Sequence, residues 1–347
     1  MDSQIFSILL EDGIGTGAIY ALLALTMVLV FATTRILFVS QGEFVTFSGL
    51  SFASFQLGVA PQIVWLLAVL AAIVTVLEIS TALGQQQGAR IPRIIAVNLV
   101  PQAVIVATCL WLAPLKPPVL VQALLSIAVV TALGPAVYRL AFQPVANASV
   151  RTLFVIAIAL HFILQGFGLL FFGAEGYRVD PLIDADLSLG GTVIKGQAIL
   201  VLATLGFLTT ALYTFFRYAL LGKALRATAS NRIGARIVGI KTPLAGRIAF
   251  TLSAFIGAVA GILAVGSTTL YYDSGFLIGL KAVLGAVCAA MLSYPIAIVG
   301  AIGVGVLETF SAFWVSAYTE AVVFSALIPV LLWLSLYALP SEEGQEL

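Results

Sequence analysis

Eleven apolar segments follow one another along the sequence, and most are long enough to cross a lipid bilayer as a helix. A membrane-spanning helix needs about 20 predominantly apolar residues. The segments lie near residues 5–33, 44–59, 61–82, 94–113, 118–138, 152–172, 196–216, 244–268, 276–294, 298–316 and 320–338. Only 9% of the residues are charged, whereas a soluble domain carries about 25%, so this chain cannot cover a water-facing surface. The sequence therefore predicts one all-α domain over residues 1–347, a polytopic transmembrane bundle of about 9–11 helices.

The distribution of basic residues predicts the orientation of this bundle. Residues 217–247, here called the basic loop, carry seven of the sixteen Lys and Arg residues and no Asp or Glu. Cytoplasmic loops are enriched in Lys and Arg, so we expect the basic loop to be cytoplasmic. The N-terminus is then extracytoplasmic and the C-terminus cytoplasmic. This orientation also places on the cytoplasmic side Arg35, Arg90, Arg93, Arg139 and Arg151. The acidic stretch 173–195 then becomes an extracytoplasmic loop.

Glycines spaced four residues apart favour close packing of two of the predicted helices. Gly13 and Gly17 share one helical face, and so do Gly257 and Gly261. Small residues on one face let neighbouring backbones approach closely, so we expect both pairs to lie at helix contacts.

The basic loop has the pattern of a short capped helix. Ser230 or Asn231 is placed as an N-cap, and Gly239 as the residue that ends the helix. Apolar positions recur every four residues and the arginines fall on other faces; these apolar positions are Leu225, Ala229, Ile233 and Ile237. We expect an amphipathic helix over about 231–238, after a longer helix that continues the preceding span. Two interpretations stay open: a docking surface for a cytoplasmic partner, or a loop that lies on anionic lipid headgroups.

The motifs of catalysis and metal binding are missing from the sequence. Gly222-Lys223 is followed by Ala224 and lacks the upstream glycine of a phosphate-binding loop, so no means of hydrolysing ATP is visible. There is no H-E-x-x-H pair, cysteine cluster or nucleophile elbow. We therefore expect no catalytic residue, no metal site and no cofactor in this chain, and a non-enzymatic role. Nucleic-acid binding is not supported, because the basic residues gather in a loop against the membrane.

Ionisable residues inside apolar segments are functional candidates by default. His161 is the only histidine and lies mid-span; we expect a neutral imidazole bonded to a neighbouring helix. Glu308 lies in the segment 298–316, and its partner is expected to be a hydroxyl or a basic group on another helix. Glu78 lies near the cytoplasmic end of its segment and is expected at the interface.

Several stretches, taken in order, resemble one known family. The run G-K-A-L-R-A-x-A-x-N-R-x-x-A-R-x-x-G-I, from 222 to 240, resembles the cytoplasmic loop of permease subunits of the branched-chain amino acid type of ABC importers. The first helix of the family is similar to residues 17–25, and its N-x-A-H-G-E stretch falls at Gly42-Glu43. Further similarities lie at 138–144, 250–263, 280–282 and 303–308. The resemblance covers roughly residues 5–45 and 136–338.

The sequence departs from the family pattern at three places. The N-x-A-H-G-E stretch reads F-V-S-Q-G-E at 38–43, so its Asn and His are replaced. The family's glycine-rich segment reads A-A-M-L-S-Y-P-I at 289–296, and the region 61–113 holds one or two added helices. These changes fall where the family's translocation path would be lined, so they leave substrate identity open and the basic loop intact.

The resemblance implies a division of labour in a bacterial inner membrane. This chain and a second permease subunit, identical or merely related, would form the path within the lipid bilayer. Two cytoplasmic ATPase subunits would bind ATP and Mg, and an extracytoplasmic binding protein would deliver substrate. The basic loop would hold the coupling helix, with coupling residues Gly222, Arg226, Ala227, Asn231, Arg232, Ala235, Arg236 and Gly239. Candidate groups along the path are Ser40, Gln41, Glu43 and Glu308.

The expected activity is alternating-access transport of branched-chain or related small amino acids. Urea, amides and small organic or aromatic acids are the alternative cargoes of such importers. An ion-coupled secondary transporter would need ionisable pairs near the midplane and helices broken by Gly or Pro. A membrane-embedded enzyme would need a cluster of His, Asp and Glu, which a single histidine disfavours.

Overall fold

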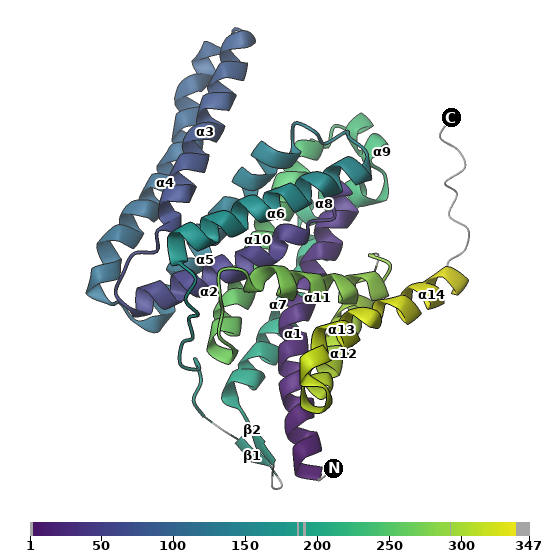
Figure 1. Ribbon diagram of the computed structural model, residues 1–347. Helices are drawn as coiled ribbons and strands as arrows, with labels where there is room; N and C mark the ends of the chain where they lie inside the picture. The colour runs from purple at the N-terminus through teal and green to yellow at the C-terminus, as the bar shows by residue number, and fades with distance from the viewer. Residues whose placement is uncertain (1–2, 186, 190–191, 292, 338–347) are drawn as a thin grey trace.

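The computed structural model describes residues 3–185, 187–189, 192–291 and 293–337, and these are almost entirely helical (Figure 1). Eight helices in this part of the chain are long and apolar enough to cross a membrane. They are α1 (Ser3–Thr34), α3 (Ile63–Gly84), α4 (Ile91–Leu112), α5 (Val119–Val137), α6 (Val150–Phe172), α7 (Gly196–Tyr218), α10 (Thr242–Ser267) and α12 (Tyr294–Trp314). The prediction of a polytopic helical bundle is confirmed.

Shorter helices complete the bundle. They are α2 (Gly42–Gln56), α8 (Leu220–Ser230), α9 (Arg232–Ile237), α11 (Ser274–Cys288), α13 (Thr319–Ser325) and α14 (Leu327–Tyr337). The antiparallel strands β1 (Leu187–Leu189) and β2 (Thr192–Ile194) form a hairpin within the loop 173–195. Helix α2 has 15 residues, or about 22 Å at 1.5 Å per residue. It is therefore too short to cross a bilayer alone.

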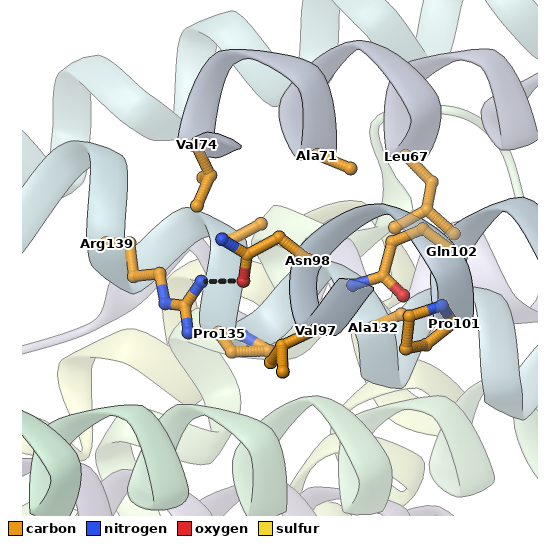
Figure 2. Close-up of a pocket in the computed structure, with 11 residues that line it drawn as sticks. Leu67, Ala71, Val74, Val97, Asn98, Pro101, Gln102, Ala132, Pro135 and Arg139 are labelled. Carbon is orange, nitrogen blue, oxygen red and sulfur yellow. Dashed lines mark hydrogen bonds between the residues drawn. The ribbon is translucent and has the colours of Figure 1, made fainter. Parts of the chain in front are cut away.

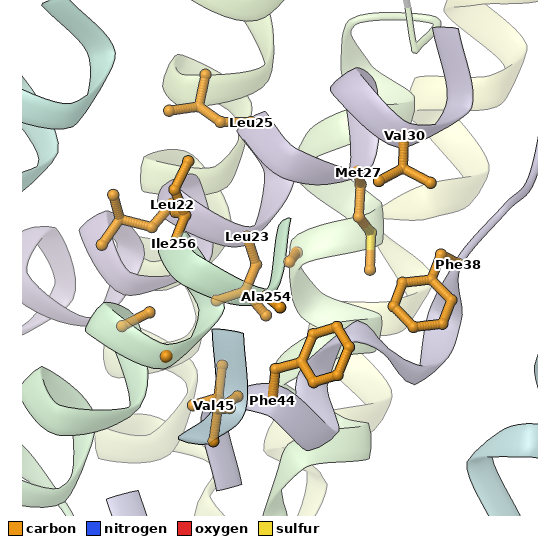
Figure 3. Packing of buried hydrophobic residues seen from close by; sticks show 14 of the residues in the cluster. Leu22, Leu23, Leu25, Met27, Val30, Phe38, Phe44, Val45, Ala254 and Ile256 are labelled. Atoms are coloured by element: carbon orange, nitrogen blue, oxygen red, sulfur yellow. The ribbon is translucent and has the colours of Figure 1, made fainter. Parts of the chain in front are cut away.

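Helix α1 lies at the centre of the bundle, against α12, α10 and α11 (Figure 1). Figure 3 shows its side chains Leu22, Leu23 and Met27 packed towards Phe44 of α2 and Ala254 of α10. Because lipid tails are as apolar as leucine, small residues that let backbones approach are what hold such helices together. Glycines supply this contact where α1 meets α12 and where α10 meets α2.

Both glycine pairs predicted to pack helices do so. Gly13 and Gly17 of α1 leave no room for a Cβ, because the backbone of α12 at Val306 and Ile302 lies against them. Gly261 of α10 touches the backbone of Val45 in the same way, and Gly257 lies beside the side chain of Phe44. These contacts bring the helix axes close, so that dispersion between backbones stabilises the bundle.

Two helices occupy the region 61–113, where added helices were expected. Helices α3 and α4 form a hairpin that stands beside the rest of the bundle and joins it along α5 (Figure 1). Much of the hairpin surface is apolar and exposed, including Val69, Val76, Val100 and Val104. A surface of this kind suits a lipid environment.

The loops gather at two ends of the bundle, in the groups predicted from charge. At one end, Lys195 pairs with Asp12, and Tyr177 forms a β-bridge with Leu270. At the other, Arg232 donates to the carbonyl of Ala146 in the turn between α5 and α6. We call this second end the basic end.

Candidate functional site

A carboxylate and an imidazole meet in the interior of the bundle. Glu43 in the first turn of α2 is fully buried, and its Oε1 lies 2.9 Å from Nδ1 of His161 on α6. The ring of Phe276 from α11 stacks on His161 with centroids 4.2 Å apart. The bond to a neighbouring helix expected for His161 is therefore present. Within the described residues, Oε2 of Glu43 has no hydrogen-bond partner, so this site retains an unused acceptor.

Ser40 and Gln41 lie in the 3-10 turn η1 (Val39–Gln41), which directly precedes Gly42 and Glu43 at the start of α2. The Ser40 hydroxyl donates to the carbonyl of Ala157 at 2.6 Å, and the Gln41 amide donates to the carbonyl of Leu23 at 3.3 Å. Both residues thus tie α2 to the neighbouring helices α6 and α1. The structure brings three of the four predicted pathway residues together; Glu308 lies in a different cluster.

The start of α2 is in backbone contact with α11. Gly42 touches the backbone of Gly275 and lies beside Gly279, while Gly275 also lies against Thr46. The two short helices therefore run antiparallel and so close that Gly42 and Gly275 could not carry a side chain at the contact. The Glu43–His161 pair thus sits at the junction of three helices, two of them too short to cross the membrane alone.

Glu308 is bound by both kinds of partner that the sequence left open. Its Oε1 lies 2.7 Å from Nζ of Lys281 on α11, and its Oε2 accepts from the hydroxyl of Tyr20 at 2.6 Å. Lys281 Nζ also lies 2.8 Å from Glu320 on α13. The Lys281 side chain is only 6% exposed, so the two carboxylates satisfy a cation that could not otherwise remain charged there.

Within the basic loop, α9 begins and ends as predicted, but α8 does not continue the preceding span, because the backbone is extended at Ala219 between α7 and α8. The side chain of Asn231 caps α9 by accepting from the backbone N–H of Gly234 at 2.8 Å. Gly239 takes φ +86°, and the Ile240 N–H returns to the carbonyl of Ala235. This is the glycine-terminated helix end expected from the sequence. A capped helix is therefore present at Arg232–Ile237, and its role in coupling stays a prediction.

The arginines of α9 are turned towards the chain itself. Besides the contact of Arg232 with Ala146, Arg236 Nη2 lies 3.2 Å from Oδ1 of Asn147. Burial lowers the pKa of the Arg232 guanidinium, and neighbouring Arg236 and Arg35 act in the same direction. These contacts fasten α9 to the turn between α5 and α6.

The exposed face of α9 is apolar. Ile233, Ile237 and Val238 are 73%, 82% and 74% exposed, and we call these three residues the apolar tip. Leu225 belongs to the same predicted apolar stripe as Ala229 and Ile233, but its side chain is buried. The chain is extended at Asn231, with φ −150° and ψ 103°, so the apolar stripe that the sequence suggested is divided between α8 and α9.

The remaining predicted coupling residues have separate surroundings. Gly222 lies against the backbone of α7, Ala227 is exposed and Ala235 is buried. Arg226 lines an apolar cavity of about 610 Å³ between α1, α7, α8 and α12. The eight predicted coupling residues therefore do not form a single surface. Most of them shape or fasten α8 and α9, and α9 presents the apolar tip.

The fold and its buried charged pairs define a class, that of polytopic membrane proteins with polar groups buried between their helices. The family model described as "Branched-chain amino acid transport system / permease component" matches residues 9–332. The chain therefore belongs to this permease family.

Three relatives are similar over much of their length. The high-affinity branched-chain amino acid transport system permease LivH of Escherichia coli (strain K12) is 31% identical over 218 residues, which are 60% of this chain and 70% of LivH. LivH of Salmonella typhimurium is 30% identical over 216 residues, with the same shares covered. BraD, the corresponding permease of Pseudomonas aeruginosa, is 28% identical over 215 residues, again 60% and 70% of the two chains.

Proposed function

We propose that this chain moves branched-chain or related small amino acids across a bacterial inner membrane by alternating access, driven by ATP hydrolysis in separate partner subunits. The substrate class is carried over from the names of the relatives, which are high-affinity branched-chain amino acid permeases. The single observation that carries the ATP-driven mechanism is the apolar tip of α9, which is exposed at the basic end and fastened to the bundle.

The basic end is assigned to the cytoplasm in this proposal. Arg35, Arg139 and the basic loop lie there, and the positive-inside rule favours that side. The N-terminus then lies on the extracytoplasmic side, together with the loop 173–195. A binding protein would deliver substrate to this outer side, and two ATPase subunits holding ATP and Mg would act at the inner side.

The apolar tip is the proposed contact with an ATPase subunit. Three large apolar side chains on a helix outside the apolar spans are unfavourable in water, and such exposed patches mark interaction sites. A hydrophobic groove receives a helix of this kind through a few anchor residues. Arg232 and Arg236 support the contact by fastening α9, so that movement of the ATPase is passed to α5 and α6.

The proposed path runs beside the start of α2. Glu43 is fully buried, and its Oε2 has no hydrogen-bond partner among the described residues. The helices α2 and α11 are short, so each has an end inside the bundle. Ends of discontinuous helices serve as substrate sites in other transporters. A second permease subunit, identical to this chain or related to it, would complete the path.

Ion-coupled transport is the second candidate, because the bundle does contain buried ionisable pairs. Glu43 faces His161, and Lys281 faces Glu308. Lys281 is neutralised by carboxylates within its own chain, which disfavours a role as an ion site. Uptake of leucine, urea and benzoate into proteoliposomes, with ATP or with a proton gradient alone, tests both the cargo and the energy source. Leucine uptake that requires ATP and the ATPase subunits is expected; uptake by this chain alone on a gradient would refute the importer.

A further inference from the structure

A largely apolar cavity lies between the α3–α4 hairpin and α5, and transport, as proposed above, does not use it. The cavity has a volume of about 250 Å³ and lies between α3, α4 and α5 (Figure 2). Most of its wall is apolar, with Leu67, Ala71 and Val97 among the lining residues. Its polar groups are the side chains of Asn98, Gln102 and Arg139. An apolar chamber with a few polar groups on its wall suits an amphiphile.

A chain of hydrogen bonds holds the polar wall in place. Asn98 is 5% exposed; its amide nitrogen donates to Glu78 at 2.8 Å, and its oxygen accepts from Arg139 Nη1 at 2.8 Å. The same Nη1 lies 3.4 Å from Glu78 Oε1. Figure 2 shows the Arg139–Asn98 bond, with Gln102 one helical turn further along α4. The geometry of this wall is therefore fixed before any ligand binds.

Donors remain unused on this wall. The Arg139 guanidinium makes its hydrogen bond and its ion pair through Nη1, and its buried Nε has no acceptor among the described residues. The other nitrogens, Nε and Nη2, form the edge with which arginine binds a phosphate in a bidentate manner. Within the described part of the chain, the side-chain amide of Gln102 likewise makes no hydrogen bond. An acceptor-rich group would satisfy both residues.

The surrounding charge is positive. Residues 79–142 contain no Asp or Glu, so Glu78 is the nearest acidic position along this region. Arg93 lies one helical turn from Val97, on the same face of α4 and nearer the α3–α4 turn, and Arg90 precedes it in η2 (Gly88–Arg90). Both arginines are exposed. An anionic ligand is therefore favoured at this end of the cavity.

We propose that this cavity binds the headgroup end of one anionic phospholipid. The phosphodiester accepts from Arg139 and the glycerol backbone from Gln102, while an acyl chain lies along the apolar wall of α3 and α4. The exposed apolar surface of the hairpin gives the second acyl chain a place beside it. Basic pockets between membrane helices are known to hold lipid headgroups. The hairpin thereby adds a lipid-binding module to the permease.

Native mass spectrometry of the full chain, released from detergent micelles, tests this proposal. Dioleoylphosphatidylglycerol and dioleoylphosphatidylcholine share the phosphodiester, but choline adds a cation that Arg139, Arg90 and Arg93 repel. We therefore expect one phosphatidylglycerol to bind about tenfold more tightly. Ala132→Phe fills the cavity and should remove this preference. Gln102→Leu keeps the Arg139–Asn98–Glu78 chain and should weaken phosphatidylglycerol severalfold. Val299→Phe, at an exposed apolar position of α12 outside the hairpin, is the control and should bind as the wild type does.

Each other result overturns the proposal. Equal binding of the two lipids would show that the headgroup is not recognised. Undiminished phosphatidylglycerol binding by Gln102→Leu would place the lipid elsewhere, and this variant remains informative even where Ala132→Phe fails to fold. Binding of inorganic phosphate at millimolar concentration, in the absence of lipid, would show that the site is one for a free anion. A wild-type dimer that carries no lipid and that Ala132→Phe abolishes would show that the hairpin is a contact between copies of the chain.

Discussion

Lys281 Nζ lies 2.7 Å from Glu308 Oε1, and this contact joins α11 to α12 within the apolar part of the bundle. Lys281 also reaches Glu320 on α13, while Tyr20 on α1 donates to Glu308. One buried cation thus ties together the consecutive helices α11, α12 and α13, and through Glu308 it also reaches α1, which is distant in sequence. Removing it would leave Glu308 without a counterion where water cannot replace it.

Lys281→Met is therefore expected to destabilise the protein strongly. Breaking a buried ion pair from one side costs about 3–5 kcal/mol. Thermal unfolding of the detergent-solubilised protein, followed by tryptophan fluorescence, measures the change. Lys281→Met combined with Glu308→Leu should recover much of the loss, because the carboxylate left unpaired is then that of Glu320, which is half exposed and can be hydrated. Lys195→Met, at the exposed pair with Asp12, is the control and should cost less than about 1 kcal/mol.

Gly261→Ala is expected to weaken the contact of α10 with α2. The added methyl group meets the carbonyl of Val45, and overpacking of this kind costs about 1–3 kcal/mol. Gly303→Ala in α12 provides a matched comparison, since a Cβ there meets nothing within 4 Å. That variant should be neutral or slightly stabilising. Equal unfolding temperatures for the two variants would argue against the close helix contact.

Glu43→Gln tests the buried pair without changing its size. The amide can still bond to His161, so the bundle should stay folded, whereas the charge offered to a substrate is removed. We expect uptake to fall at least about tenfold, which corresponds to the loss of one charged hydrogen bond. Glu78→Gln, in the hairpin, should leave uptake near that of the wild type. Unchanged uptake by Glu43→Gln would reduce the pair to a packing contact.

Asn231→Ala is expected to loosen α9. An N-cap side chain contributes about 1 kcal/mol, and a helix of six residues has few other bonds. Hydrogen exchange of the amides of Gly234 and Ala235 should accelerate severalfold. Asn231→Ser keeps a capping oxygen and should exchange nearly as slowly as the wild type. Equal protection in all three proteins would show that tertiary contacts alone hold the helix.

Much of the fold could be predicted because its signals are local. Apolar length identified the eight membrane-spanning helices of the described residues, but it also selected 44–59, 276–294 and 320–338, which fold as shorter helices. Asn231 and Gly239 marked the ends of α9 because caps act within one turn. The similarity at residues 17–25, 222–240 and 303–308 pointed to the permease family from sequence alone. These features require no knowledge of which helices touch.

The sites were predicted less completely because they join distant segments. The sequence singled out Glu308 but could not name Lys281 and Tyr20, which lie 27 and 288 positions away. Likewise, periodicity placed Leu225 and Ile233 on one stripe, whereas the extended backbone at Asn231 buries the first and exposes the second. Tertiary contacts, rather than local pattern, decided both outcomes.

Charge reversal at Arg232 and Arg236 is expected to uncouple uptake from ATP hydrolysis while the protein remains in the membrane. The two side chains fasten α9 to Ala146 and Asn147. Charge reversal removes these contacts with the turn between α5 and α6, but it does not change the apolar side chains of the tip. Uptake per ATP hydrolysed should therefore fall more than binding of the ATPase does. A parallel loss of both would indicate that the arginines themselves contact the partner.

Co-purification of the ATPase subunit with Ile233→Ser/Ile237→Ser is the most direct test of the proposed coupling. These residues are exposed, so their replacement should not disturb the bundle. An anchor residue at an interface contributes more than about 1 kcal/mol, so the pair should lower ATPase retention at least about tenfold, whereas Ile233→Val retains it. Retention and ATP-driven uptake equal to those of the wild type would contradict coupling through the apolar tip of α9.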